Sequence, residues 1–231
     1  MKSVFISGAS RGLGKDLSLY FLEKDYKVFS FSRNKIDFTH KNLLHFSDID
    51  ALNTSELKKL SLPLSQCEYL INNVGIAYDG ILATQSIESI QNMISVNITS
   101  VIYLTKLWIK ERMKIKGVGS CVNISSIISK RGFSGLSVYS STKGALNSFT
   151  QSLAREMGPQ GFRFNAILPG YFESDLSKSL SDEKKNQIIR RTPLGRLATK
   201  KDIYPIVDFI LSDSAQFITG QLISVDGGLT V

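Results

Sequence analysis

The feature that most constrains this chain is a glycine-rich loop that joins a short apolar segment to a helical pattern near the N-terminus. The apolar segment is Val4-Phe5-Ile6, and the loop reads Ser7-Gly8-Ala9-Ser10-Arg11-Gly12-Leu13-Gly14. Glycines permit a tight turn and a close approach of phosphate to the backbone, and the helix that follows offers its first N–H groups to an anion. The sequence therefore predicts a phosphate-binding loop between a strand and a helix. The residues expected at the phosphates are Gly8, Ser10, Arg11, Gly12, Leu13 and Gly14.

Strand and helix patterns alternate along the whole chain. We expect strands near 2–7, 27–32, 43–46, 68–72, 118–124, 162–168 and 222–226, and helices near 12–24, 53–61, 86–113, 139–157, 175–191 and 200–212. Most of the strands are continuous apolar runs, which is typical of a parallel sheet covered on both faces. The predicted fold is α/β, a doubly wound Rossmann fold with a seven-stranded parallel sheet and helices on both faces. It forms a single domain over 1–231, and ligands are expected at the carboxyl ends of the strands.

Composition excludes several other classes of protein. At 231 residues with 42% hydrophobic residues, the chain can bury one sizeable core. No apolar run approaches the roughly 18 residues of a membrane span, and the strand at 4–6 leaves no room for a signal peptide. The two cysteines, Cys67 and Cys121, fit a reducing cytoplasm, and neither has partners at metal-binding spacing. His40 and His45 are interpreted as a loop residue and a strand-edge residue.

The end of the second strand predicts which dinucleotide binds. A site for NAD needs an acid there to bind the ribose 2′-hydroxyl, but the chain reads Phe29-Ser30-Phe31-Ser32-Arg33-Asn34, with no acid before Asp37. Arg33 can pair with a 2′-phosphate, Ser32 can donate to it, and Arg11 can reach the same group. The expected cofactor is therefore NADP(H). Asp48, after the third strand, is either an acceptor for the adenine amino group or a surface cap.

Tyr139 and Lys143 are four residues apart, so on a helix they lie on one face. A phenol beside an ammonium is a tunable proton donor. Moving a tyrosine pKa from about 10 to about 7 takes roughly 4 kcal/mol of preferential stabilisation of the phenolate. Ser126, thirteen residues before Tyr139, ends a later strand and adds a hydroxyl donor for a substrate oxygen.

A second set with the same spacing is Ser7, Tyr20 and Lys24. Ser7 opens the glycine loop, where it would sit beside phosphate. Tyr20 and Lys24 follow on the next helix, where they are interpreted as a packing face with a charged edge. Context therefore identifies this second set as a decoy.

Positive charge is concentrated in one segment of a chain whose net charge is +8. The basic residues are Lys178, Lys184, Lys185, Arg190, Arg191, Arg196, Lys200 and Lys201, against Asp182 and Glu183. One interpretation is a solvated helical face, and the other is a mouth that attracts an acidic substrate or partner. Nucleic acid is disfavoured, because the segment lacks interleaved aromatic residues for stacking.

With these residues in hand, the chain resembles the short-chain dehydrogenase/reductase family over essentially its whole length. The matching motifs are SGASRGLG at 7–14, Asp48-Ile49, INNVG at 71–75, SVN at 95–97, Ser126, YSSTK at 139–143, LPG at 168–170 and VDGG at 225–228. One departure is Val74, where the family usually has alanine; the larger side chain is expected to shift adenosine packing slightly.

The resemblance implies a role for each matching residue. Tyr139 would be the general acid in reduction, and Lys143 would hold the nicotinamide ribose and lower the tyrosine pKa. Ser126 would polarise the carbonyl, and Asn97 would anchor a water that relays protons through Lys143. The other residues implied at the cofactor are Asp48 and Ile49, Asn73, Val74 and Gly75 on the adenosine side, and Pro169, Gly170, Phe172 and Ser174 near the nicotinamide.

Within the family, PLGR at 193–196 and FITGQLISVDGG at 217–228 are most similar to 3-oxoacyl-(acyl-carrier-protein) reductases. The resemblance implies NADPH-dependent reduction of the 3-oxo group of an acyl thioester, as in fatty acid biosynthesis, under a substrate lid near 171–200. It also implies a homotetramer, and the apolar residues Trp108, Ile109, Phe149 and Leu153 on the long helices favour one. Two alternatives stay open. The substrate could be a sugar, polyol, steroid or small ketone, or the protein could be a non-catalytic NADP-binding sensor, which the intact set Asn97, Ser126, Tyr139 and Lys143 disfavours.

Overall fold

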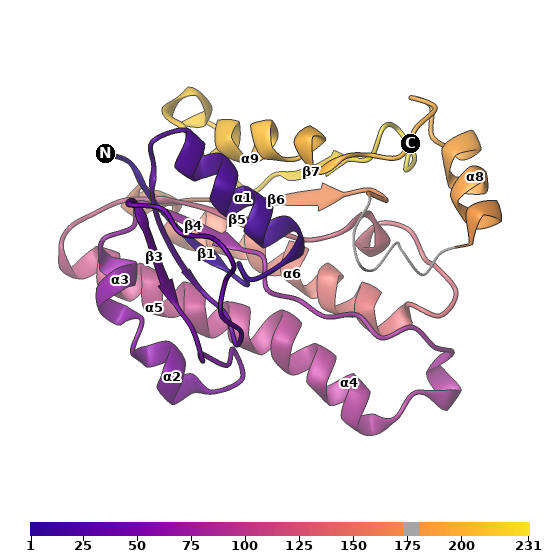
Figure 1. The fold of residues 1–231 in the computed structure, drawn as a ribbon, viewed down its shortest axis with the longest axis horizontal. Coiled ribbons are helices and arrows are strands. Elements are labelled where there is room, and N and C mark those ends of the chain that lie inside the picture. The colour runs from indigo at the N-terminus through magenta and orange to yellow at the C-terminus, as the bar shows by residue number, and fades with distance from the viewer. Residues whose placement is uncertain (173–180) are drawn as a thin grey trace.

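One parallel sheet with helices on both faces makes up the computed structural model, which describes residues 1–172 and 181–231 (Figure 1). The strands are β1 (Ser3–Ser7), β2 (Lys27–Phe31), β3 (Leu43–Phe46), β4 (Tyr69–Asn72), β5 (Ser120–Ile124), β6 (Arg163–Pro169) and β7 (Leu222–Val225). Their order across the sheet is β3-β2-β1-β4-β5-β6-β7. The predicted doubly wound Rossmann fold is confirmed, and each strand ends within two residues of its predicted limit.

The helices are α1 (Gly12–Glu23), α2 (Thr54–Lys58), α3 (Ser61–Ser65), α4 (Ile87–Ile94), α5 (Ser100–Lys114), α6 (Ser137–Met157), α8 (Asp182–Arg191) and α9 (Tyr204–Leu211). α1 and α9 pack on one face of the sheet, and α2, α3, α5 and α6 pack on the other (Figure 1). No helix in the described part of the chain is both long enough and apolar enough to cross a membrane.

Each face of the sheet has its own hydrophobic core. Trp108 of α5 is fully buried, and its ring meets Phe162 and Phe164 edge-on at centroid distances of 5.5 and 6.1 Å. Its indole N–H donates to the carbonyl of Cys67 at 2.8 Å, so the one polar atom of the ring is satisfied. On the other face, Leu17 and other apolar residues of α1 pack against α9.

Two residues of the decoy set, Tyr20 and Lys24, lie on this second face, where α1 packs against α9. Lys24 pairs with Asp208 of α9 at 2.8 Å, and the Tyr20 hydroxyl donates to the same carboxylate at 3.3 Å. Ser7 is fully buried, and its hydroxyl accepts from the backbone N–H groups of Asn73 and Val74. The interpretation of Tyr20 and Lys24 as a packing face is confirmed. The expectation that Ser7 sits beside phosphate is wrong, because this hydroxyl fastens β1 to the end of β4.

Three of the predicted helices differ in detail from the structure. The helix expected at 53–61 is two short helices, and Pro63 is accommodated in the first turn of α3, where no intrahelical N–H is needed. The helix expected at 86–113 contains a π-helical segment, Ser95–Thr99, between α4 and α5. The helix expected at 200–212 starts with the 3₁₀ turn Lys200–Asp202 before α9. Of the helix expected at 175–191, α8 accounts for the part that lies among the described residues.

The strand order fixes where ligands are expected. β1 pairs with β2 on one side and with β4 on the other, so the order reverses between β1 and β4. In open α/β sheets the crevice at this switch point, at the carboxyl ends of the strands, is the usual ligand site. The loops that follow β1, β4 and β5 open onto this crevice.

Candidate active site

Tyr139 and Lys143 lie one turn apart on α6, as their spacing predicts. The Lys143 ammonium is 5.8 Å from the centroid of the Tyr139 ring and donates to the carbonyl of Ile124 at the end of β5, at 2.8 Å. Lys143 is buried, with 4% of its surface exposed. A long cationic side chain is thus held beside the phenol by a backbone acceptor from the sheet.

Ser126 lies two residues beyond the end of β5 and caps a short 3₁₀ turn, Ile127–Ser129. Its hydroxyl oxygen accepts from the N–H of Ile128 at 3.3 Å. This bond occupies a lone pair of the oxygen and leaves the hydroxyl proton to be donated elsewhere. Ser126 can therefore serve as a donor to a substrate oxygen, as the sequence predicts.

Side chains that the sequence analysis did not single out attach the serine loop to α6. Ser125 donates to the carbonyl of Lys143 at 3.1 Å, and Ser140 donates to the carbonyl of Ile128 at 2.8 Å. Asn147 donates to the hydroxyl of Ser129, which in turn donates to the carbonyl of Ser126, at 2.8 and 2.5 Å. The run of serines at 125, 126 and 129 is the signal that could have indicated this network. These bonds fix Ser126 relative to Tyr139.

Burial shifts the pKa values of the two titratable residues in opposite directions. It raises the pKa of Tyr139 to about 12, and the Ser126 hydroxyl opposes this shift without cancelling it. It lowers the pKa of Lys143 to about 8, because the apolar surroundings disfavour the ammonium. The expected lowering of the tyrosine pKa by Lys143 is therefore absent from the described residues, where desolvation of the phenolate is the dominant effect.

Asn97 lies in the π-helical segment between α4 and α5 and is fully buried. Its amide holds both backbone groups of Ile76, accepting from the N–H and donating to the carbonyl, each at 2.8 Å. It also donates to the hydroxyl of Thr142, which lies next to Lys143, at 3.0 Å. The wider turn, a feature that often marks functional positions, directs Asn97 inward and joins the loop after β4 to α6.

Gly75 shows how closely these residues converge. A Cβ atom on Gly75 would lie 3.4 Å from the side-chain oxygen of Asn97 and 3.5 Å from the Lys143 ammonium. The structure therefore brings Asn97, Lys143 and the loop after β4 together, as the motifs predict. Asn73 of the same loop donates to the carbonyls of Ser7 and Gly8, at 3.1 and 3.2 Å, and so braces the glycine loop.

The glycine-rich loop has the shape that a bound phosphate needs. Gly8 and Gly12 have φ angles of +73° and +58°, which favour glycine. A Cβ on Gly14 would stand 2.2 Å from the carbonyl oxygen of Gly8, so only glycine lets α1 pack this close to the loop. A Cβ atom added to Gly12 would have no atom within 4 Å outside its chain neighbours. The loop is thus packed on one side and open on the other.

The N-terminus of α1 fits the phosphates of a dinucleotide. Arg11 is its N-cap and makes no side-chain capping bond, and the first turn carries no acidic residue. The N–H groups of the first turn, which have no partners within the helix, face the open side of the loop together with the positive end of the helix dipole. Leu13 belongs to this first turn, and Ser10 immediately precedes the N-cap. The residues present therefore fit the predicted cofactor.

Around the end of β2, the structure leaves Arg33 available for a 2′-phosphate but engages the Ser32 hydroxyl in another bond. Arg33 is exposed and pairs with no carboxylate within 1–172 or 181–231. Asp37, the first acid after β2, is held at 2.7 Å by Lys15. Ser32 is buried and donates its proton to the carbonyl of Asn34 at 2.6 Å, so the expectation that it donates to a 2′-phosphate is wrong. Asp48 is exposed and stands two residues beyond β3, with Ile49 buried beside it.

On the other side of the crevice, the loop after β6 packs against the C-terminal segment. Pro169 ends β6, and a Cβ on Gly170 would lie 2.8 Å from Asp226. Phe172 forms an isolated parallel bridge with Ala198. Pro169 thus stands at the carboxyl end of its strand, and the predicted contacts of Pro169, Gly170 and Phe172 with the nicotinamide stay predictions, whereas Ser174 lies outside the described residues.

A hollow of about 530 Å³ lies between the segment after α8 and the C-terminal segment. Its walls include Tyr171, Thr192 and Leu229, and none of Asn97, Ser126, Tyr139 or Lys143 lines it. Among the described residues, the four candidate catalytic side chains therefore lie outside this hollow.

The basic segment is partly neutralised. Arg196 forms a two-pronged pair with Asp202 at 2.7 Å, Lys200 pairs with Asp16 of α1, and Lys185 pairs with Asp182. Lys184, Arg190, Arg191 and Lys201 are exposed and without such pairs in the described part of the chain, while Lys178 lies outside it. The remaining positive charge is concentrated on α8.

Comparisons with known proteins agree with this geometry. A family profile described as Enoyl-(Acyl carrier protein) reductase matches residues 49–230. The 3-oxoacyl-(acyl-carrier-protein) reductase of Chlamydia pneumoniae is 31% identical over 99% of this chain and 97% of its own length. Carbonyl reductase family member 4 of Xenopus laevis is 32% identical over 97% of this chain and 96% of its own length.

Solved structures show the same fold. A short chain dehydrogenase from Leptospira borgpetersenii with bound NAD+ has a TM-score of 0.93 at 26% identity, covering 100% of this chain and 93% of that chain. ElxO with NADP bound has a TM-score of 0.89 at 28% identity, covering 99% of this chain and 98% of that chain. In its sequence, its fold and the convergence of Asn97, Ser126, Tyr139 and Lys143, the chain belongs to the short-chain dehydrogenase/reductase family of oxidoreductases.

Proposed function

We propose that this oxidoreductase uses NADPH to reduce the 3-oxo group of an acyl thioester to a hydroxyl. The observation that carries the proposal is the convergence of Ser126, Tyr139 and Lys143 at the sheet edge that also holds the glycine-rich loop. The 3-oxoacyl-(acyl-carrier-protein) reductases among the relatives support the thioester. The carbonyl reductase relative favours a second candidate, a small ketone, with the same chemistry.

The side chains perform the proton chemistry of this reaction. Hydride is what a bound NADPH would supply to the carbonyl carbon. Tyr139 then gives its phenolic proton to the carbonyl oxygen, and Ser126 donates a hydrogen bond to that oxygen while negative charge develops on it. Ser126 is available for this task because its own oxygen already accepts from Ile128.

Lys143 and Asn97 support the phenol of Tyr139 without contacting the substrate carbonyl themselves. The pKa of Lys143, lowered to about 8 by burial, lies close enough to neutrality for the ammonium to return a proton to Tyr139 after each turnover. Asn97 fixes the loop after β4 and donates to the side chain of Thr142, so it joins that loop to α6 beside Lys143. A bound NADPH would rest against Lys143, Gly75 and Pro169.

The preference for NADPH over NADH rests on Arg33. Replacing Arg33 with alanine should weaken NADPH binding by about tenfold or more and leave NADH nearly unchanged, because a charge-assisted phosphate contact is worth roughly 1.5–3 kcal/mol. Michaelis constants for both cofactors measure the effect. Lys35→Ala, in the same exposed loop, is the matched control. An equal rise for both cofactors would mean that Arg33 does not recognise the 2′-phosphate.

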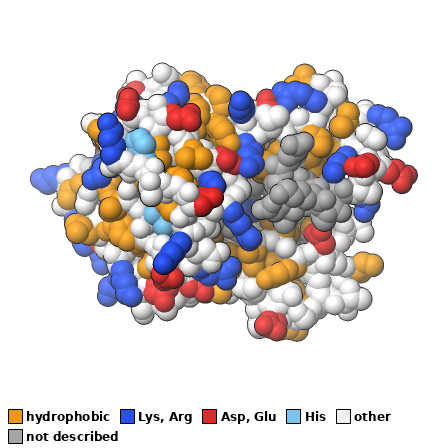
Figure 2. Space-filling view, viewed as in Figure 1, with side chains coloured by type: hydrophobic (Ala, Val, Ile, Leu, Met, Phe, Trp, Pro, Cys, Tyr) orange, Lys and Arg blue, Asp and Glu red, His pale blue; other side chains and the backbone are white. Residues whose placement is uncertain are grey.

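The acyl substrate is proposed to arrive on an acidic carrier protein attracted by α8. Figure 2 shows Lys and Arg side chains at the end of the molecule where α8 lies. Exposed charges act mainly on the rate of encounter, and salt screens them beyond about 10 Å at 0.1 M. For a carrier-bound 3-oxoacyl thioester, kcat/KM should therefore fall steeply with added salt, whereas a small neutral ketone should show little dependence.

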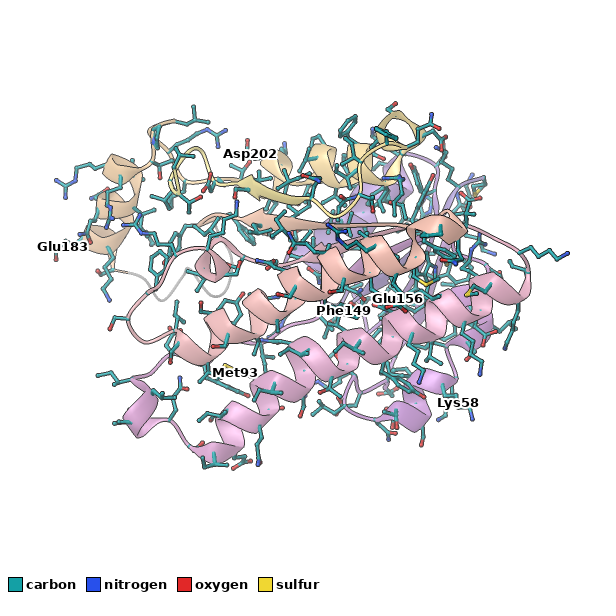
Figure 3. The ribbon with its side chains drawn as sticks, turned by 180° about the vertical axis from the view of Figure 1, so that it is seen from behind. Lys58, Met93, Phe149, Glu156, Glu183 and Asp202 are labelled. Atoms are coloured by element: carbon teal, nitrogen blue, oxygen red, sulfur yellow. The ribbon has the colours of Figure 1, made fainter. Side chains whose placement is uncertain are left out.

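Charge reversal separates the two interpretations of the basic segment. The double variant Arg190→Glu/Arg191→Glu should mimic high salt with the carrier-bound substrate. Lys58→Glu/Lys59→Glu changes the net charge equally, and Figure 3 shows Lys58 on α2 at the opposite end of the molecule from Glu183 of α8, so this control should keep full activity. If ketones are turned over far better than thioesters and salt has no effect, α8 is a solvated face and the thioester proposal fails.

We also propose a homotetramer, although two of the four apolar residues that favoured it in the sequence cannot lie at an interface between subunits. Trp108 and Leu153 are buried in the core of the subunit and present no surface to a neighbour. Ile109 and Phe149 are half-buried on α5 and α6, and Ile102 on α5 is 41% exposed. Sedimentation equilibrium at micromolar concentration should give the mass of four chains, and a mass of 25.6 kDa would reject the proposal.

A further inference from the structure

His45 lies on β3, directly opposite Ser30 of β2, and its ring spans two serine hydroxyls. Nδ1 is 2.8 Å from the hydroxyl oxygen of Ser30, and Nε2 is 3.0 Å from that of Ser32. Both serines are buried and the ring is half-buried. An imidazole with both nitrogens engaged in this way is a structural bridge between the strands, more than the strand-edge residue that the sequence indicates.

The neighbouring acceptors determine which nitrogen carries the proton. The Ser32 hydroxyl uses its proton to donate to the carbonyl of Asn34, so towards His45 it can only accept. The same carbonyl, which also can only accept, lies 3.5 Å from Nε2. Nε2 must therefore be the protonated nitrogen, and Nδ1 accepts from Ser30. Burial lowers the pKa of His45, in agreement with a neutral ring.

This chain of bonds fixes the short turn that carries Arg33. On one side of Arg33, the N–H of Ser32 donates to the carbonyl of Phe46. On the other side, the carbonyl of Asn34 is held by the Ser32 hydroxyl. Arg33 is thus exposed on a turn in which Ser32 is fastened to β3 and Asn34 is fastened to Ser32.

The same turn is connected to the phosphate loop. The N–H groups of Gly8 and Ala9 both point to the carbonyl of Phe31, at 3.0 and 3.4 Å. Further along, Lys15 of α1 holds Asp37. A displacement of the turn would therefore change the distance between Arg33 and a cofactor bound at the glycine-rich loop.

We propose that His45, as the neutral ring protonated on Nε2, is a positioning residue that sets the preference for NADPH by fixing the Ser32–Asn34 turn beneath Arg33. The inference rests on the proposed recognition of the 2′-phosphate by Arg33. His45 itself does not touch the cofactor. Its effect should therefore appear in the discrimination between NADPH and NADH and should depend on Arg33.

Binding measurements on variants test the proposal. His45→Leu removes both bonds, and the Kd for NADPH, from cofactor fluorescence, should rise roughly tenfold, the equivalent of one lost hydrogen bond, while that for NADH changes less than about twofold. His45→Gln should retain most of the preference, because its amide can still donate to Ser32. His40→Leu, which changes the only other histidine in the chain, an exposed one, should have no effect.

The double variant Arg33→Ala/His45→Leu distinguishes positioning from a general structural role. If His45 acts through Arg33, the double variant should bind NADPH no more weakly than Arg33→Ala alone. Additive losses, or an equal loss of both cofactors in His45→Leu, would overturn the inference and leave the role of Arg33 intact. An unselective Arg33→Ala would instead overturn the proposed cofactor preference, and this inference with it.

The tautomer can be measured on the unmodified protein, so the test does not depend on how the variants fold. With two histidines in the chain, two-bond ¹H–¹⁵N correlation spectra at pH 7 should show one ring with the proton on Nε2, and His45→Gln should remove that set of signals. A His45 ring protonated on Nδ1, or on both nitrogens, at this pH would overturn the proposal.

Discussion

Replacing Tyr139 with phenylalanine should lower kcat by at least about a hundredfold, within the usual range for loss of a general acid. The substitution removes one hydroxyl from a site whose other members are held independently of it. Lys143 is fixed by the carbonyl of Ile124, and Ser126 by the N–H of Ile128. NADPH affinity should therefore change little, because the glycine-rich loop and Arg33 are untouched.

The decoy residue provides the matched control. Tyr20→Phe removes a hydroxyl that donates to Asp208 on the far face of α1. It should leave kcat unchanged and cost only the stability of one partly buried hydrogen bond. Steady-state kinetics with a 3-oxoacyl thioester and fluorescence titration with NADPH measure both quantities. Near-normal turnover by Tyr139→Phe would remove the phenol from the mechanism, and turnover lost equally in both variants would indicate general damage.

The raised pKa of Tyr139 bears on the direction of the reaction. With a pKa of about 12, the phenol keeps its proton throughout the neutral range. A general acid needs its proton at the start of each cycle, so this state suits reduction of a carbonyl. Oxidation of an alcohol needs the phenolate as base, and burial of Tyr139 opposes that form. The environment of the described residues therefore keeps Tyr139 in the protonated form that a general acid needs.

The fold was predictable because its signals are local. A strand covered on both faces is a continuous apolar run, as most of the predicted strands are, and each of the seven predicted segments is a strand of the parallel sheet. The π-helical segment was not predictable, because it depends on a distant contact. Asn97 turns inward to hold the backbone of Ile76, twenty-one residues earlier in the chain, and no periodicity near Asn97 encodes that bond.

The part of the site that could be predicted is the part whose residues lie on a single helix or in a single loop. Tyr139 and Lys143 share a helix face, so their spacing was sufficient. The supporting bonds join different elements: Asn147 reaches Ser129 from α6, and His45 reaches Ser32 from the neighbouring strand. Ser32 shows the consequence most clearly. Its position after β2 suggests a phosphate donor, but a carbonyl two residues away takes its proton.

Replacing Lys143 with methionine should abolish most activity and at the same time stabilise the fold. Methionine fills a similar volume without a charge, whereas the buried ammonium is disfavoured enough to lower its pKa from 10.5 to about 8. A shift of this size corresponds to a cost on the order of 3 kcal/mol of folding free energy when the side chain is charged. The lost bond to the carbonyl of Ile124 offsets part of the gain.

The pH dependence identifies the cause. Because the folded-state pKa is the lower one, the unfolded chain binds more protons between about pH 8 and pH 10.5, and wild-type stability contributed by this group rises with pH in that window. Below about pH 8 the residue is charged in both states and its cost is constant. The stability advantage of Lys143→Met should therefore be largest at pH 7 and shrink towards pH 10.

Urea denaturation at pH 7 and at pH 9.5 measures the two differences in unfolding free energy. Lys110→Met, on the exposed side of α5, is the control and should show no pH-dependent gain. Activity should fall by at least about a hundredfold in Lys143→Met if Lys143 has its proposed roles, the proton supply to Tyr139 and the support of the cofactor ribose. The prediction fails if the variant is less stable than the wild type at pH 7, or if its advantage is the same at both pH values. Either result would show that the buried Lys143 ammonium does not lower the free energy of unfolding. The opposed effects on stability and activity are expected because catalysis needs an ammonium that the fold alone would exclude.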